Sequence, residues 1–512
     1  MHPRHFALSD PKRPALILPS TGDILTYGAL ESLANQGAHL LRELGCVRGD
    51  VIALLMDNDA SIFEVSWAAQ RIGLYVTSIS TKLSAADIGY ILKDSGARLL
   101  VASDRLGELA SQAIASSADV QGFLIDHETD SMPSWHASVA HLPDGPVADE
   151  SAGTDMLYSS GTTGRPKGVK PPLPEGALEA PTPLELMGTS LYGIAEDSIY
   201  LSTSPLYHAA PLRWAITVHR LGGTVVVMDR FDAEEALALI ERYRITHATW
   251  VPTHFVRLLK LPDETRAAFD HSSLRAVVHA AAPCPVPIKQ AMIDWWGPIV
   301  HEYYSGTECC GITALSAAEW LAKPGSVGKA VLGTVKIVDD QGQEVPNGAT
   351  GDVFFADGPA FVYHNDPEKT ASVHNDRGWA TLGDVGHLDE DGYLFLTDRR
   401  SFMIISGGVN IYPQEIENCL LTHSKVADAA VIGIPDEEMG ERVLAIIQPV
   451  EGVNGDAALS KQLTEFVRAA LGGVKTPRAI EYRTELPREP TGKLMKRRLL
   501  DEFRADTTTS RG

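Results

Sequence analysis

The sequence predicts an α/β protein: a large N-terminal domain of α/β subdomains plus a small β subdomain, followed by a smaller α+β C-terminal domain. Three observations support this fold class. The chain has 512 residues, too long for a single hydrophobic core. Strand-like and helix-like segments alternate over its first half, as in parallel α/β sheets. The pattern then changes near residue 327 and again near residue 399.

The alternation begins close to the N-terminus. The first predicted helix ends at Gly45, and a second begins at Ser84, a favourable N-cap residue. Apolar residues recur at helical spacing along the first helix, at Leu30, Leu33, Ala34, Ala38, Leu41 and Leu44. Another helix is predicted over 233–243. Short apolar runs predict buried strands at 51–55, 97–101, 224–228, 246–251 and 274–278.

The second half of the chain predicts two further units. Between 327 and 397, short β runs are interrupted by turn sequences such as Asp340-Gln-Gly342 and Asp391-Gly392, which indicates an antiparallel subdomain. A compact unit with its own strands, at 429–434, 443–450 and 478–482, follows Arg399. We therefore expect domains at 1–398 and 399–512, with residues 506–512 as a frayed tail.

Composition excludes several classes of function. The net charge of −22 argues against binding to nucleic acid or to an anionic membrane. The five cysteines show no CxxC spacing, which argues against a zinc site or a disulfide framework and for a reducing cytoplasm. We see no apolar stretch long enough to span a membrane and no secretory leader. We expect a cytoplasmic enzyme, and composition leaves a homodimer open.

The most distinctive segment is Tyr158-Ser-Ser-Gly-Thr-Thr-Gly-Arg-Pro-Lys-Gly168. Glycines let successive N–H groups point at one ligand, hydroxyls add donors, and Lys167 adds charge, so the segment suits phosphates. It is not a Walker loop, because Gly168 follows the lysine where that motif has Ser or Thr. The alternative is a flexible surface loop.

This segment resembles the phosphate-binding motif of the adenylate-forming superfamily, which includes acyl- and aryl-CoA synthetases, luciferase-like enzymes and nonribosomal adenylation domains. The other motifs of that superfamily follow in order and cover nearly the whole chain. They are Tyr304-Ser-Gly-Thr-Glu308, Thr381-Leu-Gly-Asp384, Asp398-Arg399, Ser406-Gly-Gly408, Tyr412-Pro-Gln-Glu-Ile416 and Pro490-Thr-Gly-Lys493. The chain is most similar to bacterial acyl-CoA synthetases of the fatty-acid type.

The resemblance implies a nucleotide site. Asp384 would hold the ribose hydroxyls, Tyr304 would stack on adenine, and Arg399 would lie at the ribose and phosphates. Glu308 would be the Mg²⁺ ligand. The residues implied to bind ATP or AMP are Ser159, Ser160, Gly161, Thr162, Thr163, Gly164, Lys167, Ala281, Ala282, Pro283, Glu302, Tyr303, Tyr304, Ser305, Thr307, Asp384, Arg399 and Lys493.

The resemblance also implies the remaining sites. Gly407 and Gly408 would contact CoA, and the C-terminal domain would be a mobile lid with its hinge at Ser401, where relatives usually carry Asp or Lys. A small-molecule carboxylic acid would bind in a tunnel with His208 at its mouth, where small residues and the aromatics beyond them suggest a roomy apolar pocket. The implied acyl-site residues are His208, Ala209, Ala210, Trp250, His279, Ala280 and Gly306.

The implied activity is AMP-forming acyl-CoA ligation. ATP and a hydrophobic acid would give acyl-AMP and pyrophosphate, and CoA would then displace AMP. Lys493, His208 and Thr163 are the implied catalytic residues. The alternatives are a coumarate- or ferulate-type CoA ligase, an enzyme that loads a carrier protein, a luciferase-like oxygenase and a non-catalytic nucleotide-binding homologue.

Two further expectations concern neighbouring residues. We expect Lys496-Arg-Arg498 to form a solvated basic helix face. We expect Cys309 and Cys310 to be small apolar packing residues near the pocket.

Overall fold

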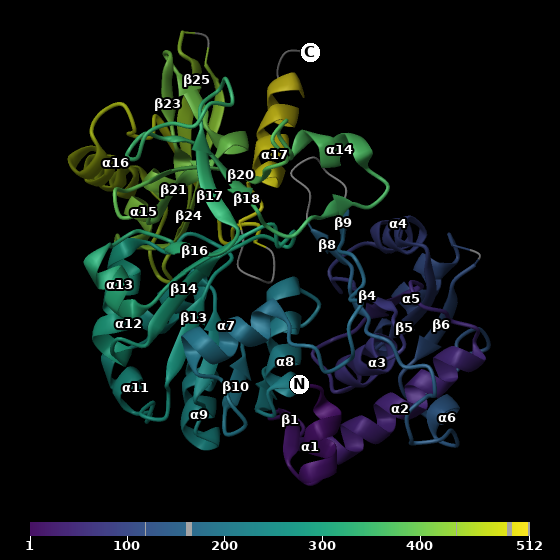
Figure 1. Cartoon of the computed structure of the whole chain (residues 1–512). Helices are drawn as coiled ribbons and strands as arrows, with labels where there is room; N and C mark the ends of the chain where they lie inside the picture. The colour runs from purple at the N-terminus through teal and green to yellow at the C-terminus, as the bar shows by residue number, and fades with distance from the viewer. Residues whose placement is uncertain (118, 160–165, 437, 489–493, 510–512) are drawn as a thin grey trace.

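The structure is a computed structural model that describes the chain apart from residues 118, 160–165, 437, 489–493 and 510–512, and apart from the side chains of 504–509. The elements fall into a large N-terminal body and a smaller C-terminal unit (Figure 1). In Figure 1 the C-terminal strands and helices lie at one end of the molecule, and the strands β17, β18 and β20 lie between them and the rest. Among the described residues, no helix has the length and apolar character needed to cross a bilayer.

The central layer of the N-terminal body is a nine-stranded sheet in the order β16-β15-β14-β13-β12-β10-β11-β1-β2. The strands from β1 to β14 in this order pair in parallel, and the pairs at the two edges are antiparallel. The bounds are β1 (Pro14–Leu18), β2 (Asp23–Thr26), β10 (Ile199–Ser202), β11 (Thr224–Val227), β12 (His247–Trp250), β13 (Ala276–His279), β14 (Val300–Tyr304), β15 (Ile312–Leu315) and β16 (Lys329–Leu332).

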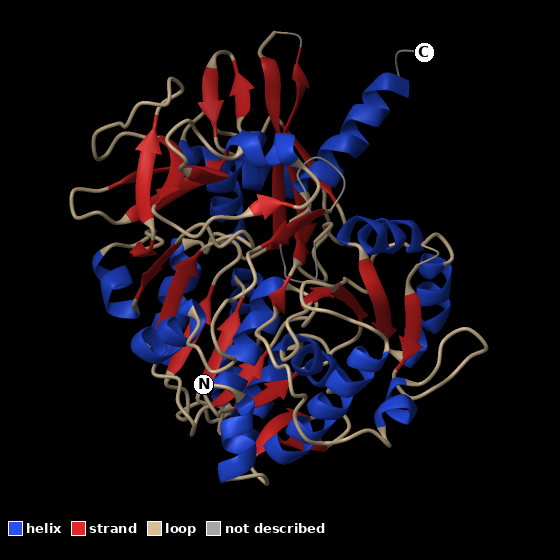
Figure 2. Ribbon diagram, turned by 45° about the vertical axis from the view of Figure 1, so that its right-hand side comes forward, coloured by secondary structure: helices blue, strands red, loops and turns tan. Residues whose placement is uncertain are grey.

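Helices cover both faces of this sheet (Figure 2). Side chains of α2, α7 and α8 join the buried cluster on one face, and those of α9, α10, α12 and α13 join the cluster on the other. The helices of this layer are α1 (Pro3–Ser9), α2 (Tyr27–Glu43), α7 (Pro183–Tyr192), α8 (Ala209–Arg220), α9 (Ala233–Tyr243), α10 (Pro252–Leu259), α11 (Asp263–Ala267), α12 (Val286–Trp296) and α13 (Ala317–Ala322).

A five-stranded parallel sheet in the order β6-β5-β3-β4-β7 forms the second layer. Its helix α4 begins where the sequence predicted, because the Ser84 hydroxyl accepts a hydrogen bond from the Asp87 amide, and it ends at Gly96 with φ of 66°. The elements are β3 (Val51–Leu55), β4 (Tyr75–Ser78), β5 (Ala97–Ala102), β6 (Gln121–Leu124), β7 (Thr154–Asp155), α3 (Ser61–Gln70), α4 (Ala85–Ser95), η1 (Asp104–Leu106), α5 (Gly107–Ile114) and α6 (Trp135–Val139).

Two small sheets lie between these layers and the C-terminal unit. One is three-stranded, in the order β19-β9-β8, and the other is the predicted antiparallel subdomain, in the order β17-β18-β20-β21. The elements are β8 (Leu157–Ser159), β9 (Lys167–Lys170), β17 (Thr334–Val338), β18 (Gly351–Ala356), β19 (Val362–Tyr363), α14 (Pro367–Ser372), β20 (Ala380–Leu388) and β21 (Leu394–Arg399).

The C-terminal unit is α+β, as expected, with its own sheet and two buried clusters. In the described part of the chain, no buried apolar cluster crosses Arg399. The elements are η2 (Arg400–Phe402), β22 (Ile404–Ser406), β23 (Val409–Ile411), α15 (Pro413–Leu421), β24 (Val426–Asp436), β25 (Gly440–Pro449), α16 (Ala457–Leu471), β26 (Ala479–Tyr482) and α17 (Lys496–Thr509).

Two expectations about the C-terminus are corrected. The predicted frayed tail is helical as far as Thr509. Lys496 does not lie on a solvated face: it is 5% exposed, and its Nζ lies 2.9 Å from Oε1 of the buried Glu417. The sequence could not distinguish a buried Lys496 from an exposed one, because its partner Glu417 lies on another helix, α15. Only Arg497 and Arg498 are exposed as predicted.

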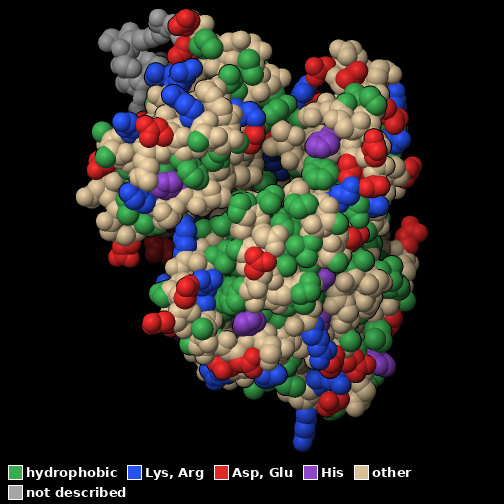
Figure 3. All heavy atoms as spheres, turned by 90° about the vertical axis from the view of Figure 1, so that its left-hand side faces the viewer, with side chains coloured by type: hydrophobic (Ala, Val, Ile, Leu, Met, Phe, Trp, Pro, Cys, Tyr) green, Lys and Arg blue, Asp and Glu red, His purple; other side chains and the backbone are tan. Residues whose placement is uncertain are grey.

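The surface carries side chains of both charges. On the face of the molecule shown in Figure 3, acidic and basic side chains are interspersed.

Candidate active site

Three predicted nucleotide-site residues, far apart in the sequence, meet between β14, β20 and β21. The Tyr304 hydroxyl donates to Oδ2 of Asp384 at 2.6 Å. Nε of Arg399 lies 3.3 Å from Oδ1 of the same carboxylate, because Asp384 and Arg399 are direct partners across β20 and β21. Asp384 is 7% exposed. The carboxylate is thus a buried double acceptor, the property expected of a group that holds two hydroxyls.

The electrostatics keep the Tyr304 phenol and the Arg399 guanidinium protonated. Burial, and then Asp384, raises the pKa of Tyr304 well above its ordinary value, so the phenol stays a donor. Burial disfavours the charge of Arg399, but Asp384, Tyr304 and Glu308 together outweigh it and raise the pKa of the guanidinium. One side of the Tyr304 ring faces Phe355, at 6.1 Å between centroids.

A second group lies around Tyr363, which the sequence analysis did not single out. Its hydroxyl donates to Oε1 of Glu308 at 2.7 Å, and Nζ of Lys167 lies 5.8 Å from its ring centroid. Burial, and then Lys369, lowers the pKa of Lys167. Tyr363 reaches the site because β19 pairs with β9, a long-range contact that no local pattern marks. The predicted metal ligand and the predicted phosphate lysine are therefore neighbours.

The turn after β14 is tightly packed. A Cβ at Gly306 would lie 2.5 Å from Oε2 of Glu308 and 2.6 Å from Cδ2 of Leu382, so a side chain there would have to displace the ends of these two side chains. This contact gives Leu382, a departure from the family pattern, a packing role. The Ser305 hydroxyl closes the turn by donating to the carbonyl of Gly311 at 2.8 Å.

The phosphate-loop residues are described only at the ends of the loop. Ser159 and Lys167 are direct partners across β8 and β9, so the two ends of the predicted loop are held together. Ser160, Gly161, Thr162, Thr163 and Gly164 lie outside the described residues, as does Lys493.

The segment after β13 carries an unusual backbone. Ala281 is exposed and has φ of 72°, a left-handed conformation that favours glycine. Ala280, Ala282 and Pro283 surround it at the carboxyl end of a parallel strand, the edge at which ligands bind in α/β sheets. The predicted segment is therefore at the edge of the sheet where a nucleotide could reach it.

Three predicted residues lie on the far side of the nine-stranded sheet from Ala210. Ala210 and Tyr303 pack against the cluster under α8, but Trp250 belongs to the cluster under α12 and is 2% exposed. His279 and Glu302 lie on that side too, where Oε2 of Glu302 is 2.6 Å from Nζ of Lys289 and 3.3 Å from Nε2 of His279. Alternate side chains of a strand point to opposite faces of the sheet. Trp250, His279 and Glu302 therefore cannot line a pocket on the face that carries Ala210 and Tyr303.

The electrostatics of this far-side contact are those of a buried ion pair. Burial disfavours the charge of Glu302, but His279 and Lys289 outweigh it and lower the pKa of the carboxyl to about 2. Burial lowers the pKa of His279 as well. The Glu302 and His279 side chains, expected at the ATP and acyl sites, are engaged in this contact instead.

The predicted mouth of the acyl site lies at the start of α8. His208 is the residue before the helix, and Ala209 and Ala210 form its first turn; all three are half-buried. One turn further, Nε1 of Trp214 donates to the Tyr303 hydroxyl at 3.2 Å. The start of α8 therefore lies one turn from two aromatic side chains, of which Trp214 is fully buried.

The predicted CoA residues lie far from these groups. Gly407 and Gly408 form a two-residue turn between β22 and β23, with φ of 56° and 78°, as a type I′ turn requires. A Cβ at Gly407 would also lie 2.4 Å from Cε of Met439. In Figure 1, β23 is at the end of the C-terminal unit away from β13 and β14.

The junction between the two parts is held by Asp398. Its carboxylate accepts from the amide of Arg399 at 2.6 Å and from that of Gln414 at 2.8 Å. Ser401 follows in η2, and the neighbouring Arg400 pairs with Asp340.

The residues present fit Mg²⁺ better than zinc. Within the described ranges, no group of three or more His, Cys, Asp or Glu side chains is placed to hold a metal. Glu308 offers a single carboxylate, whereas protein zinc sites need three or four ligands. Mg²⁺ is commonly bound by one or two carboxylates together with substrate phosphates.

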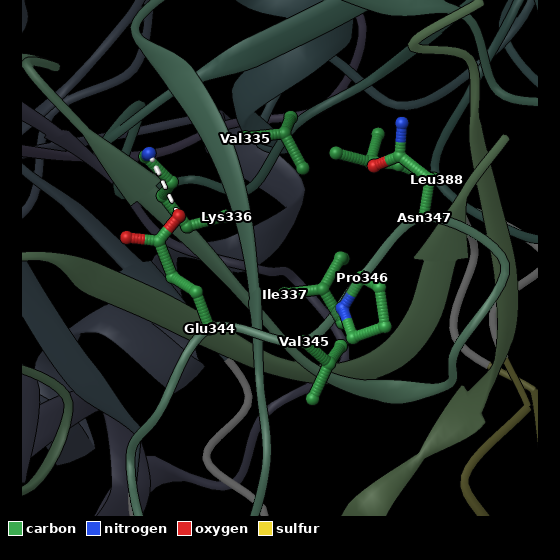
Figure 4. A pocket seen from close by; sticks show the side chains of 8 residues that line it. All are labelled: Val335, Lys336, Ile337, Glu344, Val345, Pro346, Asn347 and Leu388. Carbon is green, nitrogen blue, oxygen red and sulfur yellow. Dashed lines mark hydrogen bonds and ion pairs between the residues drawn. The ribbon is translucent and has the colours of Figure 1, made fainter. Parts of the chain in front are cut away.

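A cavity of about 210 Å³ lies outside this site, between β17, Leu388 and the segment from Glu344 to Asn347 (Figure 4). Lys336 and Glu344 pair at its rim at 2.9 Å. None of the predicted site residues lines it.

Fold and site together define the class of protein, an adenylate-forming enzyme. The family model for the AMP-binding enzyme matches residues 4–361, and the model for the C-terminal domain of the AMP-binding enzyme matches residues 415–493. The chain belongs to the AMP-binding enzyme family, in the group of AMP-forming acyl-CoA ligases, which are acid–thiol ligases.

The relatives differ in the acids that they are named for. The chain is 32% identical to the long-chain-fatty-acid–CoA ligase FadD13 of Mycobacterium tuberculosis over 98% of both chains. It is 33% identical to the feruloyl-CoA synthase of Amycolatopsis sp over 93% of both. A crystal structure of the anthranilate CoA ligase AuaEII in complex with anthranoyl-AMP superposes with a TM-score of 0.85, at 25% identity, over 98% of this chain and 96% of that one.

Proposed function

We propose that this enzyme activates a hydrophobic monocarboxylic acid with ATP and transfers the acyl group to CoA. The observation that carries the proposal is the convergence of Tyr304 and Arg399 on the buried carboxylate of Asp384. The group around Tyr363 adds an acid, Glu308, and a cation, Lys167.

Each group has a role in nucleotide binding under this proposal. Asp384 accepts from the ribose hydroxyls, and Arg399 and Lys167 offset phosphate charge. The backbone around Ala281 and the ring of Tyr304 line the adenine. Glu308 holds Mg²⁺, which when bound neutralises charge on the phosphates.

The reaction has two balanced steps. In the first, a carboxylate oxygen bonds to the α-phosphorus of ATP, and the bond to pyrophosphate breaks. In the second, the CoA sulfur bonds to the acyl carbon, AMP leaves, and the thiol proton goes to solvent. The first step concentrates negative charge on the leaving group, and Lys493 is the proposed cation that stabilises it.

We propose that residues 399–512 act as a lid that pivots near Ser401. The distance of the Gly407-Gly408 turn from β13 and β14 in Figure 1 supports this, because a CoA role for the turn needs the lid to rotate. Lys493→Ala should therefore abolish pyrophosphate exchange and spare thioester formation from supplied acyl-AMP. Equal loss of both half-reactions would overturn this division.

The proposed acid is of the fatty-acid type, in line with the similarity to FadD13. The hydrogen bond between Trp214 and Tyr303 favours a second candidate, an acid with one aromatic ring. Under this candidate, the two side chains would form the end of the acyl site one helical turn beyond Ala210, where aromatic rings suit a flat ring better than a long chain.

A panel of straight-chain and phenylpropenoic acids decides between the two candidates, scored by AMP release that needs both ATP and CoA. Ala210→Phe tests the position of the site. Overpacking of about 1–3 kcal/mol should suppress long acids and spare short ones. An equal effect on every acid, or none, would make Ala210 a packing residue.

A further inference from the structure

Arg213 ties helix α8 to the strand that leads into the phosphate loop. It lies one turn after Ala209, and its side chain is 16% exposed. Its Nε and Nη2 donate to Oδ2 and Oδ1 of Asp155, each at 2.7 Å, a bidentate pair. Asp155 is the last residue of β7, and β8 begins two residues later.

The same guanidinium holds both neighbours of Glu308. Nη1 of Arg213 donates to the carbonyl of Thr307 at 3.2 Å and to Sγ of Cys309 at 3.2 Å. Cys309 has φ of 51°, a conformation that residues with a Cβ rarely adopt, so the turn gains from an external hold. Cys309 is therefore more than the apolar packing residue expected from the sequence, whereas Cys310 is buried as predicted.

Arg213 forms its ion pair with Asp155 and not with Glu308, so the Glu308 carboxylate is not neutralised by this arginine. Its two-pronged contact is with Asp155, while Oε1 of Glu308 accepts from Tyr363. A planar fork with five donors can serve a carboxylate and two further acceptors at once, and lysine cannot.

We infer that Arg213 is a positioning residue for adenylation, which fixes the backbone on both sides of Glu308 and so aims its carboxylate at the metal-bearing nucleotide. The inference rests on the proposed function, because the metal role of Glu308 belongs to that proposal. It also couples three parts of the site: the start of the acyl site on α8, the strand that leads to the phosphate loop, and the turn that carries Glu308.

Helix α8 supplies a matched control. Two turns beyond Arg213, Nε of Arg220 donates to Oε2 of Glu185 at 2.7 Å, and its Nη2 donates to the carbonyl of Ala180 at 2.6 Å. This is a second arginine–carboxylate contact in the body of the protein, directed at α7 and not at the Glu308 turn. A general loss of stability should follow substitution of either arginine.

The experiment measures nucleotide binding by calorimetry with α,β-methylene-ATP, once in Mg²⁺ and once in EDTA, using the full chain. Arg213→Lys should weaken binding in Mg²⁺ about tenfold, since supporting contacts to metal ligands are commonly worth 10- to 100-fold. Binding in EDTA should stay within about twofold. Arg220→Lys should change neither value. The inference would be overturned if Arg213→Lys bound the nucleotide as tightly in Mg²⁺ as the wild type does. It would also be overturned if the variant lost affinity equally in Mg²⁺ and in EDTA.

Asp155→Asn keeps the test decisive if the arginine variant folds poorly. It leaves Arg213 in place but weakens its anchor, and should reproduce the Mg²⁺-specific loss. The double variant should then lose little more than either single one, because the residues act through one contact; additive losses would count against the inference. If the wild-type protein shows no Mg²⁺-dependent nucleotide binding, the proposed function itself is wrong. If the wild type shows such binding but the Arg213 variant keeps it, only the positioning role of Arg213 is wrong.

Discussion

At the scale of single residues, the site depends on side chains and backbone angles that must be held in place. Asp384 carries two contacts, and Glu308 is held by the Tyr363 hydroxyl. Ala281 holds a left-handed backbone without being glycine. Each of these features gives a measurable consequence for one substitution.

Glu308→Gln should raise the Mg²⁺ concentration needed for half-maximal pyrophosphate exchange and slow that step. A neutral amide is a weaker ligand for a hard cation, yet its oxygen can still accept from Tyr363, so the fold should persist. Mg²⁺ titration of the exchange rate measures the effect, with Tyr363→Phe as the control that removes the hydroxyl only. A titration curve that does not move would exclude Glu308 as the metal ligand.

Ala281→Gly should leave stability unchanged or raise it by up to about 1 kcal/mol. Relief of a left-handed backbone, about 1–2 kcal/mol, offsets the added freedom of glycine in the unfolded chain. Ala282→Gly is the matched control, because Ala282 is not among the residues with positive φ, and it should cost about 0.5–1 kcal/mol. Melting temperatures of the two variants test the difference. Equal destabilisation would mean that the φ of Ala281 stores no strain.

At the scale of elements, the sequence predicted the helices and strands better than it predicted the site. The Ser84 cap, the strand at 51–55 and the antiparallel subdomain follow from local chemistry and periodicity, and they are confirmed. Tyr363 and Arg213 could not be found in this way, because they reach the site through strand pairing and helix packing between distant segments. Trp250 was misplaced for a related reason, since the sequence does not say which face of β12 it occupies.

A histidine on α6, between α3 and the end of β6, predicts how stability depends on pH. His136 contacts Glu64 at 3.0 Å and Asp126 at 2.7 Å. The hydrogen bond that His136 donates to Glu64 outweighs burial and, with Asp126, raises the pKa of His136 to about 9. The folded pKa lies above the unfolded value of about 6.5, so the contact stabilises fully below pH 6.5, and its contribution is lost as pH rises through 9.

His136→Gln tests this contribution. The melting temperature of the wild type should exceed that of the variant most clearly near pH 6, and the difference should fade above about pH 9. A constant difference across this range would show that His136 stabilises by packing and not by charge.

At the scale of the whole molecule, several polar contacts join the two parts among the residues that the structure describes. Nζ of Lys260, the residue that follows α10, donates to the carbonyls of Val426 and Ala427 at 2.5 and 3.3 Å. Asp398 and Arg400 hold the chain where it passes from one part to the other. Domain interfaces of this polar kind are typical of parts that shift during turnover.

The central claim is that the enzyme joins a carboxylate to the adenylyl group of ATP. The most direct measurement uses an acid labelled with ¹⁸O in both carboxylate oxygens, together with ATP and CoA, and weighs the products by mass spectrometry. The account predicts that AMP carries one ¹⁸O atom and that pyrophosphate carries none, because the labelled oxygen bonds to the α-phosphorus and stays there when the thiol attacks. Label in inorganic phosphate with ADP as the other product, or unlabelled AMP, would contradict it.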